Sequence, residues 1–293
     1  FKNLKIILNS DNLILVNESV GFSSLPMLII SKFSKKLNVT IFVMGLYSKK
    51  LRFPKLRFFH YKIIQFLVYF TENVVFLGAL EMNKALKMHK KNSHKFKHIP
   101  FPVDTKFWDS EKPTHLSENK NIIFVGNDGN RDYKLLNDIA LRMNNYNFIF
   151  VTSNEFINKI KLPNVNVVYG SWGSEFVTDK KLRDMYLSSK ISIIPLKDSY
   201  QPSGQSVALQ SMSLGIPVVT TDTKGYWGSE VFFDNETIFL VEKNDVDTWV
   251  NILTELFDET DLLNKISSNA KKLVNRKYDM ETFYNEISNL LQK

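Results

Sequence analysis

The sequence contains no cysteine among its 293 residues. Disulfide scaffolds, thiolate metal sites and cysteine nucleophiles are therefore excluded, and the absence is consistent with a reducing compartment. Long apolar runs are also missing, because the best candidate, residues 63–70, is far shorter than the roughly 18–20 residues that cross a bilayer. Glycine and proline are scarce, with 11 and 9 residues, which excludes collagen-like and low-complexity chains. A hydrophobic content of 44% predicts a globular chain of one large or two ordinary domains.

The sequence does not begin as a complete chain is expected to begin. Its first residue is Phe1 rather than methionine, and residues 4–8 already form a strand-like run, so we expect a truncated piece of a longer protein. No signal peptide is recognisable in these residues. Together with the absence of cysteine, this favours a cytoplasmic location.

Positive charge is concentrated in residues 48–100, which contain 12 Lys or Arg against two Glu, a net of +10 in a chain of +8. Within them, residues 52–69 interleave basic and aromatic side chains, a pattern typical of a helix on an anionic membrane surface. The alternative is a core helix whose Lys and Arg side chains extend into solvent. No nucleic-acid-binding motif accompanies the segment, so we expect no nucleic acid as a partner. The five histidines have no carboxylate at ligand spacing, and we predict no metal site.

Short β-branched runs alternate with segments of helical spacing, which predicts an α/β fold with parallel sheets. The strand-like runs are residues 12–16, 39–43, 74–77, 122–125, 148–151, 165–168, 191–194 and 217–219. The helical patterns are residues 134–143, 179–188, 206–214 and 246–292. Ligands of such sheets bind beyond the carboxyl ends of the strands, so the loops after Val125, Val151, Ile194 and Val219 should line the site.

Two prolines, Pro100 and Pro102, break any helix and precede a polar stretch, residues 109–121, that is typical of a linker. This pattern predicts two Rossmann-like, doubly wound domains that face one cleft. We place a partial first domain at residues 1–105, a second domain at residues 106–279, and a terminal helix that packs back on the first domain at residues 280–293.

The loop after residues 122–125 begins Gly126-Asn127-Asp128 and contains Arg131. Its glycines allow close backbone approach, the following helix offers free N–H groups, and an arginine can grip an anion such as a diphosphate with two bonds. The alternative is a simple turn in which Asp132 caps the helix.

A second constellation lies in residues 195–219. Ser203-Gly204 precede a helix that begins with Gln205, Ser206 and Val207, whose amides could hold a phosphate. Gln210 follows Ser206 by one helical turn and can hydrogen-bond a sugar hydroxyl in either direction. Ser203 lacks the flanking glycines of a nucleophile elbow, so a serine hydrolase is not expected.

Residues 195–219 resemble the donor-site signature of the family-four retaining glycosyltransferases, which have the two-domain GT-B architecture. In this family a strand leads through a loop and a helix to a Gly-x-Pro-Val-Val strand, here Gly215 to Val219. Residues 101–107 resemble the segment that joins the two domains. Residues 164–170, which end in Tyr169-Gly170, resemble the nucleotide-side strand, and residues 239–245 continue the likeness.

The sequence departs from this family at charged positions. The family's two glutamates fall on Pro202 and Gln210, and the family's arginine after the first strand of the second domain falls on Asn127. The glycine-rich acceptor loop is absent, and Met44-Gly45 stands where relatives often have His-Gly.

The resemblance implies a metal-independent, retaining hexosyltransferase that needs no cofactor and takes a nucleotide-diphosphate sugar as co-substrate. Arg131, assisted by Lys197, would neutralise the diphosphate. The loop residues Gly126, Asn127 and Asp128 and the segment from Ser203 to Val207 would surround the donor, Gln210 would hold the ribose, and Tyr169 and Gly170 would lie on the nucleotide side. The acceptor would be a glycan or a lipid-linked glycan. The alternatives are a nucleotide-sugar epimerase or hydrolase on the same scaffold and a non-catalytic nucleotide-sugar or glycan binding module.

Overall fold

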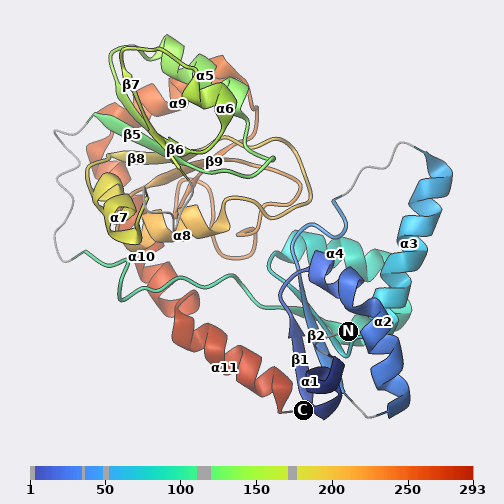
Figure 1. Ribbon diagram of the computed structural model, residues 1–293. Helices are drawn as coiled ribbons and strands as arrows, with labels where there is room; N and C mark the ends of the chain where they lie inside the picture. Colours follow the sequence, from blue (N-terminus) through green and yellow to red (C-terminus); the bar gives the residue numbers. More distant parts are fainter. Residues whose placement is uncertain (1–3, 35–36, 49–52, 111–119, 171–176, 293) are drawn as a thin grey trace.

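The computed structural model describes residues 4–34, 37–48, 53–110, 120–170 and 177–292. It contains two parallel sheets, each accompanied by helices, so the predicted α/β class is confirmed (Figure 1). The domains face each other. Parts of three predicted features fall outside the described residues, namely Phe1, the cations Lys49, Lys50 and Arg52, and residues 111–119 of the linker.

The first sheet has the order β1-β2-β3-β4 with all neighbours parallel. Its strands are β1 (Asn12–Leu15), β2 (Asn38–Val43), β3 (Asn73–Phe76) and β4 (Phe96–His98). The helices around it are α1 (Leu4–Asn9), α2 (Glu18–Ser34), α3 (Pro54–Tyr69) and α4 (Ala79–Met88), followed by the 3₁₀ helix η1 (Lys90–Lys95). The β-branched runs form strands because alternate side chains can pack into one apolar core, in which Val43, Val74 and Phe76 are fully buried.

The strand-like interpretation of residues 4–8 is wrong, because these residues belong to α1, which packs against α2. A short apolar run has the same composition in a buried helix as in a strand, and its periodicity does not separate the two. Here Ile7 is buried in the core of the first domain while its neighbour Ile6 is exposed.

The second sheet has the order β10-β9-β8-β5-β6-β7, again parallel throughout. Its strands are β5 (Asn121–Val125), β6 (Asn147–Thr152), β7 (Val165–Tyr169), β8 (Ile191–Ile194), β9 (Val218–Thr221) and β10 (Phe239–Val241). The chain winds from β5 outward to β7 and then returns to β8, so the winding reverses between β5 and β8. This reversal point is where open α/β sheets bind ligands.

Helices cover both faces of the second sheet. They are α5 (Tyr133–Arg142), α6 (Glu155–Asn158), α7 (Asp179–Leu187), α8 (Gln205–Ser213), α9 (Val246–Asp258) and α10 (Thr260–Lys277). One apolar cluster contains buried residues of α7, α8 and α10, and another contains those of α5 and α9. None of the helices in the described ranges is long and apolar enough to span a bilayer.

The last helix, α11 (Met280–Leu291), extends from the second domain to the first (Figure 1). The ring of Phe283 lies 6.1 Å from that of Phe42 on β2. Where α11 begins, Val103 N donates to Tyr278 O at 2.8 Å, so the two chain segments that cross between the domains run side by side. The numerical boundaries given above for the two domains and the terminal helix stay predictions.

Candidate functional site

Three adjoining cavities lie where the reversal point of the second sheet meets the first domain. The switch-point cavity, of about 280 Å³, is lined by residues 125–128, Arg131, Val151, Val177, Leu182, Ser206, Val207 and Gln210. The facing cavity, of about 300 Å³, lies between residues 201–206 with Asp128 and Arg131 on one side and Asn17, Glu18, Ser19, Met44 and Phe101 on the other. The interdomain cavity, of about 720 Å³, shares Ser206 and Gln210 with the switch-point cavity. The predicted loops after β5 and β8 therefore do meet.

Arg131 lines both smaller cavities although it is only 3% exposed. Its Nη1 lies 3.2 Å from Asp128 Oδ2, yet Nε and Nη1 have no hydrogen-bond partner among the described residues. Burial lowers the pKa of the guanidinium, and Asp128 opposes this change. An arginine nevertheless keeps its charge in a protein. A buried cation with unused donors is costly, and an anionic ligand in these cavities would satisfy it.

Two glycines make room for this guanidinium. A Cβ atom built on Gly126 would collide with Arg131 Nε, and one built on Gly204 would lie 3.4 Å from Nη1. Gly204 also has φ of +82°, a left-handed conformation that favours glycine. The arginine is therefore held between the loop after β5 and the loop before α8.

The N-terminus of α8 opens toward the same space. Its cap, Gly204, provides no side-chain hydrogen bond, and the first helical bond runs from Ala208 N to Gly204 O at 3.0 Å. The N–H groups of Gln205, Ser206 and Val207 precede that bond, as expected at a helix start. With the positive end of the helix dipole beside Arg131, this is a favourable place for a phosphate group.

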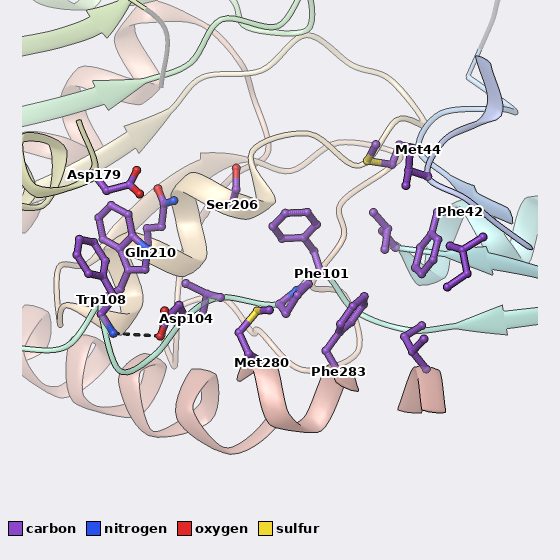
Figure 2. Close-up of a pocket in the computed structure, with 17 residues that line it drawn as sticks. Phe42, Met44, Phe101, Asp104, Trp108, Asp179, Ser206, Gln210, Met280 and Phe283 are labelled. Carbon is purple, nitrogen blue, oxygen red and sulfur yellow. Dashed lines mark hydrogen bonds between the residues drawn. The ribbon is translucent and has the colours of Figure 1, made fainter. Parts of the chain in front are cut away.

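Gln210 lies one turn further along α8, as its spacing from Ser206 predicts. It is 2% exposed, and its Oε1 is buried with no hydrogen-bond partner among the described residues. Figure 2 shows Gln210 with Asp179 and Ser206 at one end of the interdomain cavity, while Phe42, Met44, Phe101, Met280 and Phe283 line the rest. The polar side chains of Gln210, Asp179 and Ser206 therefore gather at the end that the cavity shares with the switch-point cavity, together with the ring of Trp108.

The two loops that hold Arg131 are bonded to each other. Asn130 Nδ2 donates to Ser203 Oγ at 2.8 Å, and Lys197 N donates to Asn130 O at 2.8 Å. The ammonium of Lys197 is exposed and donates to Gly129 O at 3.2 Å. The backbone before Lys197 pairs with Arg131, but Lys197 lines none of the three cavities, so its ammonium does not join the guanidinium in the site.

Asn127 lies just beyond the end of β5, and Tyr169 and Gly170 lie at the end of β7, beside Thr152 at the end of β6. Asn127 Oδ1 accepts from Thr152 Oγ1 at 3.0 Å, and its Nδ2 donates to Gly170 O at 3.4 Å. Tyr169 OH donates to Glu155 Oε1 at 2.6 Å. Asn127 lines the switch-point cavity, whereas Tyr169 and Gly170 lie outside all three cavities.

The loop before α8 also contacts the first domain. Gln205 Nε2 donates to Leu77 O at 2.6 Å, and the side chain of Pro202 lies 3.2 Å from where a Cβ on Gly78 would be. Gly45, with φ of +100°, packs against Gln201 in the same way. These contacts hold the two sides of the facing cavity together.

Glu81 positions the first-domain side of this junction, a role that sequence reasoning missed. Its carboxylate accepts from Gly45 N at 3.0 Å and from Tyr47 N at 3.1 Å, while Glu18 accepts from Met44 N at 3.2 Å. Glu81 is 1% exposed, and burial raises its pKa to about 7, although the two backbone N–H groups oppose the shift. An acidic residue two positions into a helix gives no sequence signal that it will turn inward.

Tyr226 and Trp227, in the loop after β9, are buried and pack with Phe232 in an apolar core of the second domain. Within the described residues, no group of three His, Asp or Glu side chains is placed to hold a metal ion.

Residues 174–273 match the family model described as glycosyl transferases group 1, a segment that includes the loop before α8, α8 itself and the following strand. The chain resembles the group 1 glycosyl transferases. No curated protein matches the sequence. This family model covers about a third of the chain, and for the other residues the solved structures show a shared fold.

The whole fold is similar to that of several glycosyltransferases. Anabaena HepE in complex with UDP aligns with a TM-score of 0.77 at 13% identity, over 99% of this chain and 81% of that chain. Sucrose-phosphate synthase from Thermosynechococcus elongatus aligns with a TM-score of 0.78 at 13% identity, over 100% and 75%. A glycosyltransferase from Rickettsia africae aligns with a TM-score of 0.76 at 15% identity, over 99% and 80%. The chain therefore has the GT-B fold that was predicted.

Proposed function

We propose that the protein transfers a sugar from a nucleotide-diphosphate sugar to an acceptor hydroxyl, with retention of anomeric configuration and without a metal ion. The observation that carries this proposal is Arg131, a buried cation with unused donors beside the open N-terminus of α8. The similarity of residues 174–273 to group 1 glycosyl transferases supports the reaction class. The neighbouring HepE structures with UDP and UDP-glucose support a nucleotide-sugar donor.

In this proposal the donor occupies the switch-point and facing cavities. The diphosphate lies between Arg131 and the amides of Gln205 to Val207, which stabilise the negative charge that develops as the sugar leaves. Oε1 of Gln210, which has no partner among the described residues, accepts a hydrogen bond from a hydroxyl of the ribose. Positive charge from the arginine and the helix start takes the place that a divalent cation has in other transferases.

The transferred sugar would lie in the facing cavity, between Ser203 and the first-domain residues Asn17 and Glu18. An acceptor hydroxyl placed there can attack the anomeric carbon from the side on which the diphosphate departs, which gives retention without a protein nucleophile. Positioning two substrates in this way can contribute several kcal/mol to lowering the barrier. We propose a glycan or lipid-linked glycan, presented at the cytoplasmic face of a membrane, as the acceptor.

Nucleotide binding is tested first, by thermal unfolding with UDP, GDP, ADP and their sugar conjugates in the presence of a chelator. Ligand at 100 times its Kd stabilises the folded state by about 2.7 kcal/mol. At 2–4 °C per kcal/mol, roughly the value for domains of 150–250 residues, the midpoint should rise by several degrees. Arg131→Ala should abolish this rise and lower transfer of radiolabelled sugar by orders of magnitude.

Arg142→Ala is the matched control, because Arg142 is an exposed arginine at the C-terminal end of α5 that pairs with the exposed Asp247. It should keep both the midpoint shift and the turnover. Near-wild-type turnover of Arg131→Ala would remove Arg131 from the mechanism. A nucleotide shift without transfer to any acceptor would favour the binding module, and donor consumption without an acceptor would favour an epimerase or hydrolase.

A further inference from the structure

Helix α3 exposes large apolar side chains along its outward side. Leu56, Phe58, Phe59, Ile63 and Phe66 are each between 45% and 61% exposed. At 100° per residue, Phe59, Ile63 and Phe66 form one stripe along the helix. Single exposed apolar residues are common on soluble proteins, but a continuous patch of this kind marks an interaction surface.

The fold does not need this side of the helix. The inward side of α3 packs through Ile64, Leu67 and Val68, all of which are buried. Tyr61 OH donates to Met88 O at 3.0 Å and so ties α3 to the end of α4. The helix is therefore fixed to the first domain by one side and presents the other as a rigid surface.

Positive charge runs along the apolar stripe. Lys55 and Lys62 are seven residues apart and exposed, so they lie one above the other beside Phe59 and Phe66. Lys62 Nζ lies 5.5 Å from the ring centre of Phe58. The helix contains no acidic residue from Pro54 to Tyr69. A partner that fits this surface is therefore apolar within and negatively charged at its boundary.

The basic surface continues at the C-terminal end of α3. Lys95 Nζ donates to Val68 O at 2.9 Å and to Thr71 O at 2.6 Å, which places η1 beside the end of the helix. In η1 the side chains of Lys90 and Lys91 are exposed. A second copy of the chain would bring these like charges together, which disfavours a symmetric dimer through α3.

We propose that the outward side of α3 docks the protein onto the surface of a membrane that contains anionic lipids. Phe59, Ile63 and Phe66 enter the boundary between headgroups and acyl chains, and Lys55 and Lys62 lie at the level of the lipid phosphates. The chemistry that the surface recognises is a sheet of negative headgroups over hydrocarbon, rather than a single phosphate group.

The docked orientation connects this surface with the candidate site. In Figure 1, α3 lies on the outer side of the first domain, away from the second. The same β2–α3 connection supplies Met44, which lines the facing and interdomain cavities. Resting on the proposed function, docking through α3 attaches the first domain, which lines one side of the facing cavity, to the membrane in which a lipid-linked acceptor is held.

The test is co-sedimentation of the full chain with two kinds of vesicle. One is phosphatidylcholine alone, and the other contains about 30% of the anionic lipid phosphatidylglycerol. Binding to the anionic vesicles should weaken at least 100-fold in the variant Phe59→Gln/Ile63→Gln/Phe66→Gln. Lys55→Gln/Lys62→Gln should weaken it roughly 25-fold at low salt, from about 1 kcal/mol for each lysine. Glutamine preserves helix propensity, so α3 itself should remain folded.

Leu141→Gln is the matched control, because Leu141 is 58% exposed on α5 in the second domain, and it should bind vesicles as the wild type does. Equal vesicle binding by the wild type and the α3 variants would overturn the proposal, as would no binding of the wild type to anionic vesicles. A dimer in light scattering that the α3 variants abolish would assign the surface to a second copy instead. The nucleotide-dependent rise of the unfolding midpoint should persist in all α3 variants. Absence of this rise in the wild type would count against the proposed function and would leave the vesicle result unchanged.

Discussion

The buried carboxyl of Glu81 makes the stability of the protein depend on pH in a defined direction. Burial raises its pKa from 4.5 to about 7 in the folded chain. Folding therefore favours the protonated form, and the contribution of this group is fully present below pH 4.5 and lost as the pH rises through 7. A difference of about 2.5 pKa units at about 1.4 kcal/mol each amounts to roughly 3 kcal/mol.

The perturbation is Glu81→Gln, which keeps the shape of the side chain and removes its titration. Chemical unfolding of both proteins at several pH values between 5 and 8, at constant ionic strength, gives the difference in unfolding free energy. All other groups are common to both proteins, so the change in this difference with pH isolates Glu81. Relative to the variant, the wild type should lose about 2.5 kcal/mol from pH 5 to pH 8, because the unfolded carboxyl already titrates in part below pH 5. A difference that is the same at both ends of this range would refute the reasoning.

Three further substitutions test the junction around the site. Gly204→Ala should lower the free energy of unfolding by about 1–2 kcal/mol, which is the cost of a left-handed conformation for a residue with a Cβ. Gly129→Ala, with open space around the added methyl group, should change the free energy of unfolding little, and equal effects of the two substitutions in urea unfolding would contradict this. Gln205→Ala leaves the carbonyl of Leu77 without its 2.6 Å bond, so small-angle scattering should show a larger radius of gyration, and an unchanged radius would mean that other contacts hold the domains. Lys197→Ala should change turnover less than about threefold, because its ammonium is exposed, and a loss of orders of magnitude would return it to the mechanism.

The parts of the fold that could be predicted from the sequence are those set by local patterns. Runs such as residues 122–125 and 191–194 are β-branched and become neighbouring strands β5 and β8. Because both strands are parallel and their following loops meet at one edge, the proximity of Asn130 and Ser203 followed from topology. The run at residues 4–8 failed because apolar composition without length or alternation is ambiguous.

The parts that could not be predicted depend on contacts between distant segments. Gln205 and Leu77 are 128 residues apart in the chain, and no local pattern links them. The sequence placed Arg131 and Lys197 together as cations of one site, but long side chains have many rotamers, and only packing decides which of them turns inward. Gly126 and Gly204 clear the space for Arg131, whereas Lys197 bonds to a loop carbonyl at the surface.

The contact between α11 and the first domain has a consequence for how the protein is made. Phe42 and Phe283 touch across about 240 residues of intervening chain. A ribosome adds roughly 5–20 residues per second, so Phe42 emerges some 10 to 50 s before its partner. During that interval the ring of Phe42 lacks its contact with Phe283, so this side of β2 is more open to water and to other nascent chains. The first domain is therefore synthesised first but gains this contact only when the last helix has been made, and chaperones have the longest time to act on this domain.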